Sequence, residues 1–134
     1  MSPILIVDDD AEIRKTLSIL LAGAGLLVEE SNGPDALRRI ESEKPWLMLL
    51  DIVMPVMGGI AVLQAAMKIS PGLIVLMLTG ESDIDIAKGA LDFGARAYIT
   101  KPFDGPALRR EIEDLKAKIT GVGGPAPYRP WRLE

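Results

Sequence analysis

Three segments of the sequence are apolar at every position, and they constrain the fold more than any other feature. A strand with one wet face alternates apolar and polar residues, whereas a strand covered on both faces is apolar throughout. These segments are therefore predicted to be central strands of a parallel sheet. They are "ILIV" at 4–7, "WLMLL" at 46–50 and "LIVLML" at 73–78.

Two shorter candidates, "LLVE" at 26–29 and "AYI" at 97–99, suit flanking or edge positions of the same sheet. Between the strands, apolar residues recur at helical spacing. Five strand–helix units predict a parallel sheet covered by helices on both faces, with right-handed crossovers. The predicted inward-facing helix residues are Ile13, Leu17, Leu20 and Ala24; Ala36, Leu37 and Ile40; Ile60, Leu63 and Met67; Ile86, Ala90 and Phe93; and Leu108, Ile112, Leu115 and Ile119.

One stretch, residues 46–63, is long enough for a membrane helix and carries a single charge, Asp51. A central Asp would cost about 2.5–3.5 kcal/mol on insertion, and Pro55, Gly58 and Gly59 interrupt the run. We therefore predict strand, turn and helix, and no membrane partner. The chain also begins without the basic pattern of a signal peptide, so the expected location is cytoplasmic.

Composition limits the chemistry. The chain has no cysteine, which excludes disulfides, thiolate metal sites and cysteine nucleophiles, and no histidine, the commonest general base. Its net charge of −4 argues against a sequence-independent grip on nucleic acid phosphates, so we expect no direct contact with nucleic acid. Any reaction must use carboxylates, Lys, Ser or Thr.

Charged and hydroxyl groups gather where the predicted strands end. Ligands of an open α/β sheet bind beyond the carboxyl ends of its strands. Taken singly, each group has a structural explanation: Asp10, for example, is the predicted N-cap of a helix that begins near Ala11. Taken together, those explanations leave the clustering unaccounted for. The residues are Asp8, Asp9 and Asp10 after the first strand, Asp51 after the third, Thr79 after the fourth, and Lys101 after the fifth.

Clustered carboxylates stay ionised together when cations compensate their charge. Lys101 and one divalent metal would balance Asp8, Asp9 and Asp51. An all-oxygen site suits Mg²⁺, and aspartate is an established nucleophile toward phosphoryl groups. The sequence therefore predicts that Asp51 accepts a phosphoryl group at a magnesium site.

Four segments, "ILIVDDD", "LLDIVMP", "VLMLTG" and "YITKPF", resemble in order the signature segments of the receiver domain of two-component response regulators. The resemblance covers about residues 3–119. It implies a flavodoxin-like (βα)5 fold, a doubly wound five-stranded parallel sheet with strand order 2-1-3-4-5. It also divides the chain into a receiver (response regulatory) domain at 1–119 and a Gly/Pro-rich linker or tail at 120–134.

The resemblance implies a metal-binding role for four residues. Asp51 would be the phosphoacceptor and a metal ligand, and Asp9 would bind Mg²⁺ directly. Asp8 would help directly or through water, and the carbonyl of Val53 would supply another ligand.

The resemblance also implies a switch. Thr79 and Lys101 would contact the phosphoryl oxygens, and Lys101–Pro102 would be a cis peptide. Tyr98 would be the switch aromatic, turning inward once Thr79 is drawn toward the phosphoryl group. The surface formed by the helix at 82–93, the fifth strand and the last helix would then change shape and bind a partner.

The implied function is phosphorelay signal transduction. The phosphoryl donor would be a sensor histidine kinase or a histidine phosphotransfer protein. The receiving partner would be a downstream protein or an output domain, with a second copy of the chain as a further candidate. The domain would not be an enzyme, but a phosphoacceptor that assists its own phosphorylation and dephosphorylation.

Three alternatives have recognisable marks. A phosphatase with an aspartyl nucleophile would carry a second Asp at position 53, where the chain has Val53. A nucleotide-binding Rossmann domain would need a glycine-rich turn after the first strand, where the chain has acids. A receiver that only binds partners would lack an acid, the Thr or the Lys, and all are present. Val53 and Glu81 occupy positions that tune phosphoryl lifetime in the family, so the lifetime is not predicted.

Overall fold

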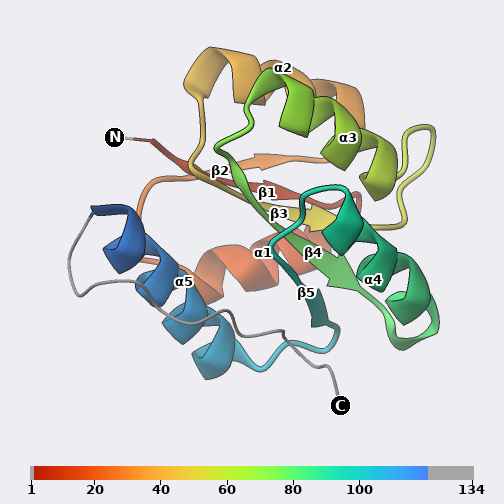
Figure 1. The fold of residues 1–134 in the computed structure, drawn as a ribbon. Helices are drawn as coiled ribbons and strands as arrows, with labels where there is room; N and C mark the ends of the chain where they lie inside the picture. Colours follow the sequence, from red (N-terminus) through yellow and green to blue (C-terminus); the bar gives the residue numbers. More distant parts are fainter. Residues whose placement is uncertain (1, 121–134) are drawn as a thin grey trace.

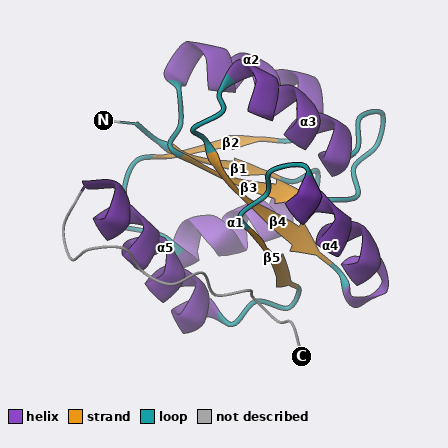
Figure 2. Ribbon diagram, viewed as in Figure 1, coloured by secondary structure: helices purple, strands orange, loops and turns teal. Residues whose placement is uncertain are grey.

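The computed structural model describes residues 2–120 as a five-stranded parallel sheet between two layers of helices (Figures 1 and 2). The strand order is β2-β1-β3-β4-β5, which confirms the fold class and the order implied by the resemblance. The tail from residue 121 onward lies outside the described residues. The strands are β1 (Ile4–Val7), β2 (Leu27–Glu30), β3 (Leu47–Asp51), β4 (Ile74–Thr79) and β5 (Ala97–Thr100).

Helices α1 and α5 cover one face of the sheet, and α2, α3 and α4 cover the other (Figure 1). A short 3₁₀ helix, η1, precedes α4. The bounds are α1 (Ala11–Leu20), α2 (Gly33–Glu43), α3 (Gly59–Ile69), η1 (Glu81–Asp83), α4 (Ile84–Asp92) and α5 (Gly105–Thr120).

The central strands are buried on both faces, as their apolar sequences predict. All four residues of β1 are fully buried. Because successive strand side chains point to opposite faces, Leu5 and Val7 enter the core under α2, α3 and α4, while Ile4 and Ile6 enter the core under α1 and α5. Burying one such aliphatic side chain contributes about 1.5–3 kcal/mol, so β1 anchors both layers.

Side-chain caps begin the first two helices. The carboxylate of Asp10 accepts a hydrogen bond from the main-chain N–H of Glu12 at 2.9 Å, which confirms Asp10 as the N-cap of α1. The side chain of Asn32 accepts from the N–H of Asp35 at 2.9 Å, and Pro34 occupies the first turn of α2.

The apolar stretch at 46–63 divides as predicted into a strand, a turn and the start of a helix. β3 ends at Asp51 and α3 begins at Gly59. Among residues 2–120, no helix has both the length and the apolar composition that crossing a membrane requires.

The predicted inward face of α4 was right for Ala90 but wrong for Ile86 and Phe93. Ile86 and Phe93 are 48% and 47% exposed, whereas Ala87 and Ala90 are fully buried. The spacing of Ile86, Ala90 and Phe93 is helical, but so is that of Ile84, Ala87 and Ala90. The face of α4 that carries Ala87 and Ala90 packs against the sheet. The large apolar side chains of Ile86 and Phe93 are left about half exposed.

Two further residues show the limits of the helix pattern. Ala24 is buried as predicted, but it lies beyond α1, which ends at Leu20. Ile119 is 54% exposed, about one turn past Leu115, which is buried. Helical spacing alone does not mark where a helix stops touching the core.

The two edge strands of the sheet are β2 and β5, each four residues long, as predicted for the weaker candidates. β2 ends in the adjacent acids Glu29 and Glu30. The guanidinium of Arg39, on α2, donates to Glu30 at 2.5 Å and to Glu43 at 2.5 Å. This edge strand therefore ends in two acids, and one of them is paired with an arginine of α2.

Candidate functional site

An acidic cluster forms at the carboxyl ends of β1 and β3. Asp8 and Asp9 follow β1, and Asp51 is the last residue of β3. The two strands are neighbours, with Val7 in register with Leu50, so the residues that follow this pair meet at the same level. One carboxylate oxygen from each of the three acids lies within 4.8 Å of the others.

Lys101 joins two of these acids from the end of β5. Its Nζ lies 3.2 Å from Asp8 Oδ2 and 3.2 Å from Asp51 Oδ1. Asp8 is fully buried and Asp51 is 6% exposed, while the lysine side chain is 25% exposed. The peptide bond between Lys101 and Pro102 is cis. The ammonium thus donates to both buried carboxylates at once.

Burial controls the ionisation of this group. Burial, followed by the negative charge of Asp8, raises the pKa of Asp51 to about 6, although Lys101 opposes the shift. Burial also disfavours the ammonium of Lys101, but the charges of Asp51 and Asp8 outweigh it and the pKa of Lys101 is raised. At neutral pH three carboxylates face one ammonium, so the site holds an excess of negative charge.

The donor set fits Mg²⁺, which binds through a few carboxylate oxygens and retains several waters. Asp9 is exposed, so its carboxylate can meet a partly hydrated ion. Both oxygens of Asp8 are already engaged, Oδ1 by the N–H of Asp10 at 2.9 Å and Oδ2 by Lys101. This leaves Asp9 and Asp51 as the better placed direct ligands. The side chain of Val53, in the loop after β3, is 59% exposed, and the role of its carbonyl stays a prediction.

Thr79 and Tyr98 lie on the two strands beyond β3. Thr79 ends β4, is 1% exposed, and its hydroxyl donates to the carbonyl of Gly80 at 2.9 Å. Tyr98 is in register with Met77 and is 1% exposed, packed in the core under α2, α3 and α4. The expected switch turns this ring inward only after phosphorylation, whereas the ring is already inward here. Movement of the ring stays a prediction.

Gly59 belongs to the site, although the sequence indicates for it only a place in a turn. A Cβ atom added to Gly59 would lie 2.2 Å from the carbonyl oxygen of Asp51 and 2.8 Å from Cα of Ile52. The N–H of Gly59 also donates to the carbonyl of Ile52 at 2.8 Å. The first turn of α3 therefore packs directly on the strand end that carries Asp51. The glycine pair in the sequence was the available signal, but it did not say which glycine mattered.

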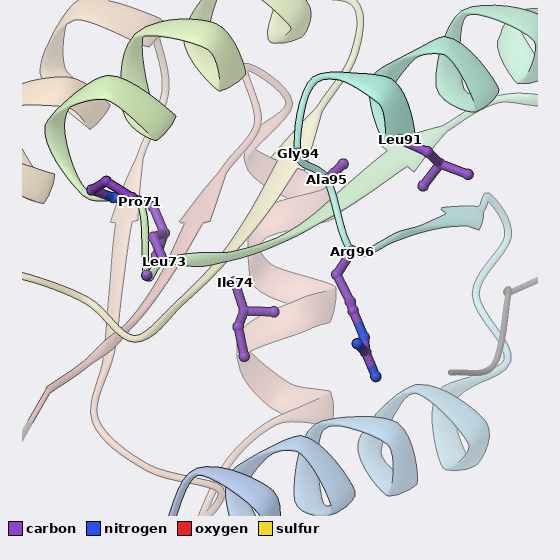
Figure 3. A pocket seen from close by; sticks show the side chains of 8 residues that line it. Pro71, Leu73, Ile74, Leu91, Gly94, Ala95 and Arg96 are labelled. Atoms are coloured by element: carbon purple, nitrogen blue, oxygen red, sulfur yellow. The ribbon is translucent and has the colours of Figure 1, made fainter. Parts of the chain in front are cut away.

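A pocket lies at the other end of the strands, where β4 and β5 begin (Figure 3). It is lined by residues 71–74, Leu91 and residues 94–96, around the loops that lead into β4 and β5. Thr79 and Lys101 are at the other ends of these strands. The pocket is therefore separate from the acidic cluster, and it contributes nothing to that site.

The metal-free protein is expected to lose stability as pH rises from about 4 to about 6, relative to Asp51→Asn. A folded-state pKa of about 6, above the ordinary 3.8, means that the folded chain binds this proton more tightly. The stabilisation is complete below about pH 3.8 and is lost as pH rises through about 6, by at most about 3 kcal/mol. Urea unfolding in EDTA across this range measures it. Identical pH slopes for both proteins would contradict the raised pKa.

The sequence pattern described as "Response regulator receiver domain" matches residues 4–113. The DNA-binding transcriptional regulator NtrC of Escherichia coli strain K12 is 43% identical over 100 residues, covering 74% of this chain and 21% of that protein. The transcriptional regulatory protein GlrR of the same strain is 32% identical over 130 residues, covering 96% of this chain and 28% of that protein. The chain thus spans 21% to 28% of the length of these relatives.

Solved structures show the same similarity. The receiver domain of NtrX from Brucella abortus is 33% identical with a TM-score of 0.78, covering 82% of this chain and 94% of that one. A CheY-like receiver domain protein from Methanospirillum hungatei JF-1 is 33% identical with a TM-score of 0.80, covering 90% and 98%. Because NtrC is named as a DNA-binding regulator, the expectation of no direct nucleic acid contact does not fit full-length relatives of this kind.

Proposed function

Because the chain belongs to the response regulator receiver domain family, we propose that it acts in phosphorelay signalling by accepting a phosphoryl group on Asp51. The observation that carries this proposal is the acidic cluster bridged by Lys101, whose Nζ lies 3.2 Å from both Asp8 and Asp51. A nucleophilic carboxylate and a cation beside it are the parts that phosphoryl transfer to aspartate requires.

The donor is a phosphohistidine on a sensor histidine kinase or a phosphotransfer protein, because this chain has no histidine of its own. An oxygen of Asp51 attacks the phosphorus and forms the new O–P bond. The N–P bond of the donor breaks, and its nitrogen keeps the electron pair and takes a proton from solvent. A pKa of about 6 leaves Asp51 mostly ionised, and so nucleophilic, at neutral pH.

The surrounding residues stabilise the negative charge of the transferred group. Asp9 and Asp51 would hold Mg²⁺ directly, Asp8 would help directly or through water, and the carbonyl of Val53 would be a further ligand. The bound ion would supply positive charge to the transferred group. Lys101, whose Nζ lies 3.2 Å from Asp51 Oδ1, supplies a second positive charge. The domain is thus a phosphoacceptor switch rather than an enzyme, although its own residues assist both phosphorylation and dephosphorylation.

Phosphorylation of Asp51 changes the shape of a partner-binding surface through a movement of Thr79. Its hydroxyl exchanges the carbonyl of Gly80 for a phosphoryl oxygen, a stronger charge-assisted acceptor, and the loop before α4 moves with it. Tyr98 and α4 then repack, because well-packed elements change between discrete arrangements. The exposed side chains of Ile86 and Phe93 add apolar area to this surface. A downstream protein, an output domain or a second copy of the chain binds there.

Intact-mass spectrometry with acetyl phosphate and Mg²⁺ tests the proposal. The wild-type chain should gain one phosphoryl group, and Asp51→Asn should gain none because the nucleophile is missing. Thr79→Ala should keep the gain, since Thr79 acts after the transfer. Absence of any mass gain in the wild type, or an equal gain in Asp51→Asn, would overturn the assignment.

A further inference from the structure

Arg14, in the first turns of α1, holds the main chain of the acidic loop. One terminal nitrogen of its guanidinium donates to the carbonyl oxygen of Asp8 at 2.7 Å. The arginine side chain is 19% exposed, so this contact is largely shielded from water. Unlike Lys101, which binds the carboxylate of Asp8, Arg14 binds its main chain.

A second group of contacts fixes the guanidinium itself. Arg14 Nε donates to Glu29 Oε1 at 3.3 Å, and the hydroxyl of Ser18 donates to Glu29 Oε2 at 2.8 Å. Glu29 comes from β2 and Ser18 from the next turn of α1. Because a guanidinium is planar and donates in fixed directions, bonds to Glu29 and to Asp8 leave it little freedom.

The carbonyl of Asp8 matters because each of the other polar groups of this residue also has a partner. Its N–H donates to the carbonyl of Glu30 at 3.2 Å. Its carboxylate accepts from the N–H of Asp10 and from Lys101. Arg14 completes this set by binding the carbonyl oxygen of Asp8, where the chain turns toward Asp9. A change in that turn would move both carboxylates relative to Asp51.

We infer that Arg14 is a positioning residue of the acidic site, an inference that rests on the proposed magnesium-dependent function. Its guanidinium sets the path of the loop that presents Asp8 and Asp9 beside Asp51. Charge alone predicts the opposite effect. A cation near the site repels Mg²⁺, so its removal by itself would tighten Mg²⁺ binding. If Arg14 positions the loop, its removal weakens Mg²⁺ binding. The positioning and charge explanations therefore predict opposite changes in Mg²⁺ affinity.

Calorimetric titration of the 134-residue chain with MgCl₂ separates them. Arg14→Met keeps most of the apolar stem and removes the guanidinium. We expect its Mg²⁺ affinity to fall by about tenfold or more, the usual effect of removing a group that orients a metal ligand. Arg14→Lys should recover part of the loss, since an ammonium can donate to one acceptor but does not reproduce the fork.

Lys15→Met is the matched control, because it removes one positive charge from the neighbouring, exposed position on α1. It should leave Mg²⁺ affinity unchanged or slightly higher. Unchanged or tighter binding by folded Arg14→Met would overturn the inference. If that variant does not fold, wild-type affinity in Arg14→Lys together with unchanged amide signals of residues 8–10 would overturn it. Failure of the wild-type chain to bind Mg²⁺ would instead overturn the proposed function, on which this inference depends.

Discussion

Replacement of Lys101 by methionine is expected to lower the free energy of unfolding by about 3 kcal/mol in metal-free buffer at pH 7. The change leaves the carboxylates of Asp8 and Asp51, 0% and 6% exposed, without the cation that they share. Removing one partner of a buried ion pair costs about 3–5 kcal/mol. The lower value is expected because Asp51 can take up a proton and limit the loss. Urea unfolding in EDTA measures it.

A double-mutant cycle gives the control. In the Asp51→Asn background one buried charge is already gone, so Lys101→Met should cost at least about 1 kcal/mol less than in the wild type. Equal losses in both backgrounds would show that the contact between Lys101 and Asp51 contributes nothing to stability. Addition of Mg²⁺ should recover part of the stability of the single variant, since the ion binds only the folded chain.

Gly59→Ala is expected to destabilise the chain by about 3 kcal/mol, the upper range for forcing extra volume into a packed site. The added methyl would meet the main chain of Asp51 at 2.2 Å, and a backbone carbonyl does not rotate away as a flexible side chain does. The strand end must shift, so the Mg²⁺ affinity of the variant should fall as well. Thermal melts and calorimetry measure the two effects.

The adjacent glycine supplies a matched comparison. A Cβ on Gly58 would lie 3.7 Å from the carbonyl oxygen of Ile52, an ordinary contact, and its φ of −70° suits any residue. Gly58→Ala should therefore cost no more than about 1 kcal/mol, mainly through its effect as the N-cap of α3. Similar losses for the two glycines would contradict the close approach of α3 to Asp51.

The sheet and the acidic cluster were predictable because both follow from short patterns. Strands buried on both faces have no polar positions, so 4–7 and 46–50 were recognisable without their neighbours. The carboxyl ends of parallel strands meet at one edge. The acids after those strands, Asp8 and Asp51, therefore had to converge once the strands were assigned, although many residues separate them in the chain.

What the sequence did not reveal depends on distances between elements. Ile86 and Ala87 lie on overlapping helical stripes, and the space between α4 and the sheet decides which one is buried. Gly58 and Gly59 are equivalent in the sequence, yet only Gly59 packs closely against the end of β3. In the sequence Arg14 resembles any charged helix residue. Only the structure shows its hydrogen bond to the carbonyl of Asp8.

The charged edge of β2 has a consequence for behaviour at high concentration. An unpaired strand edge is a template on which a second chain can add a strand and begin a fibril. Here that edge is four residues long and ends in Glu29 and Glu30, and Arg39 of α2 binds Glu30. Such an edge opposes lateral growth of the sheet from one molecule to the next. On the β2 side of the sheet, association between copies by strand addition is therefore disfavoured.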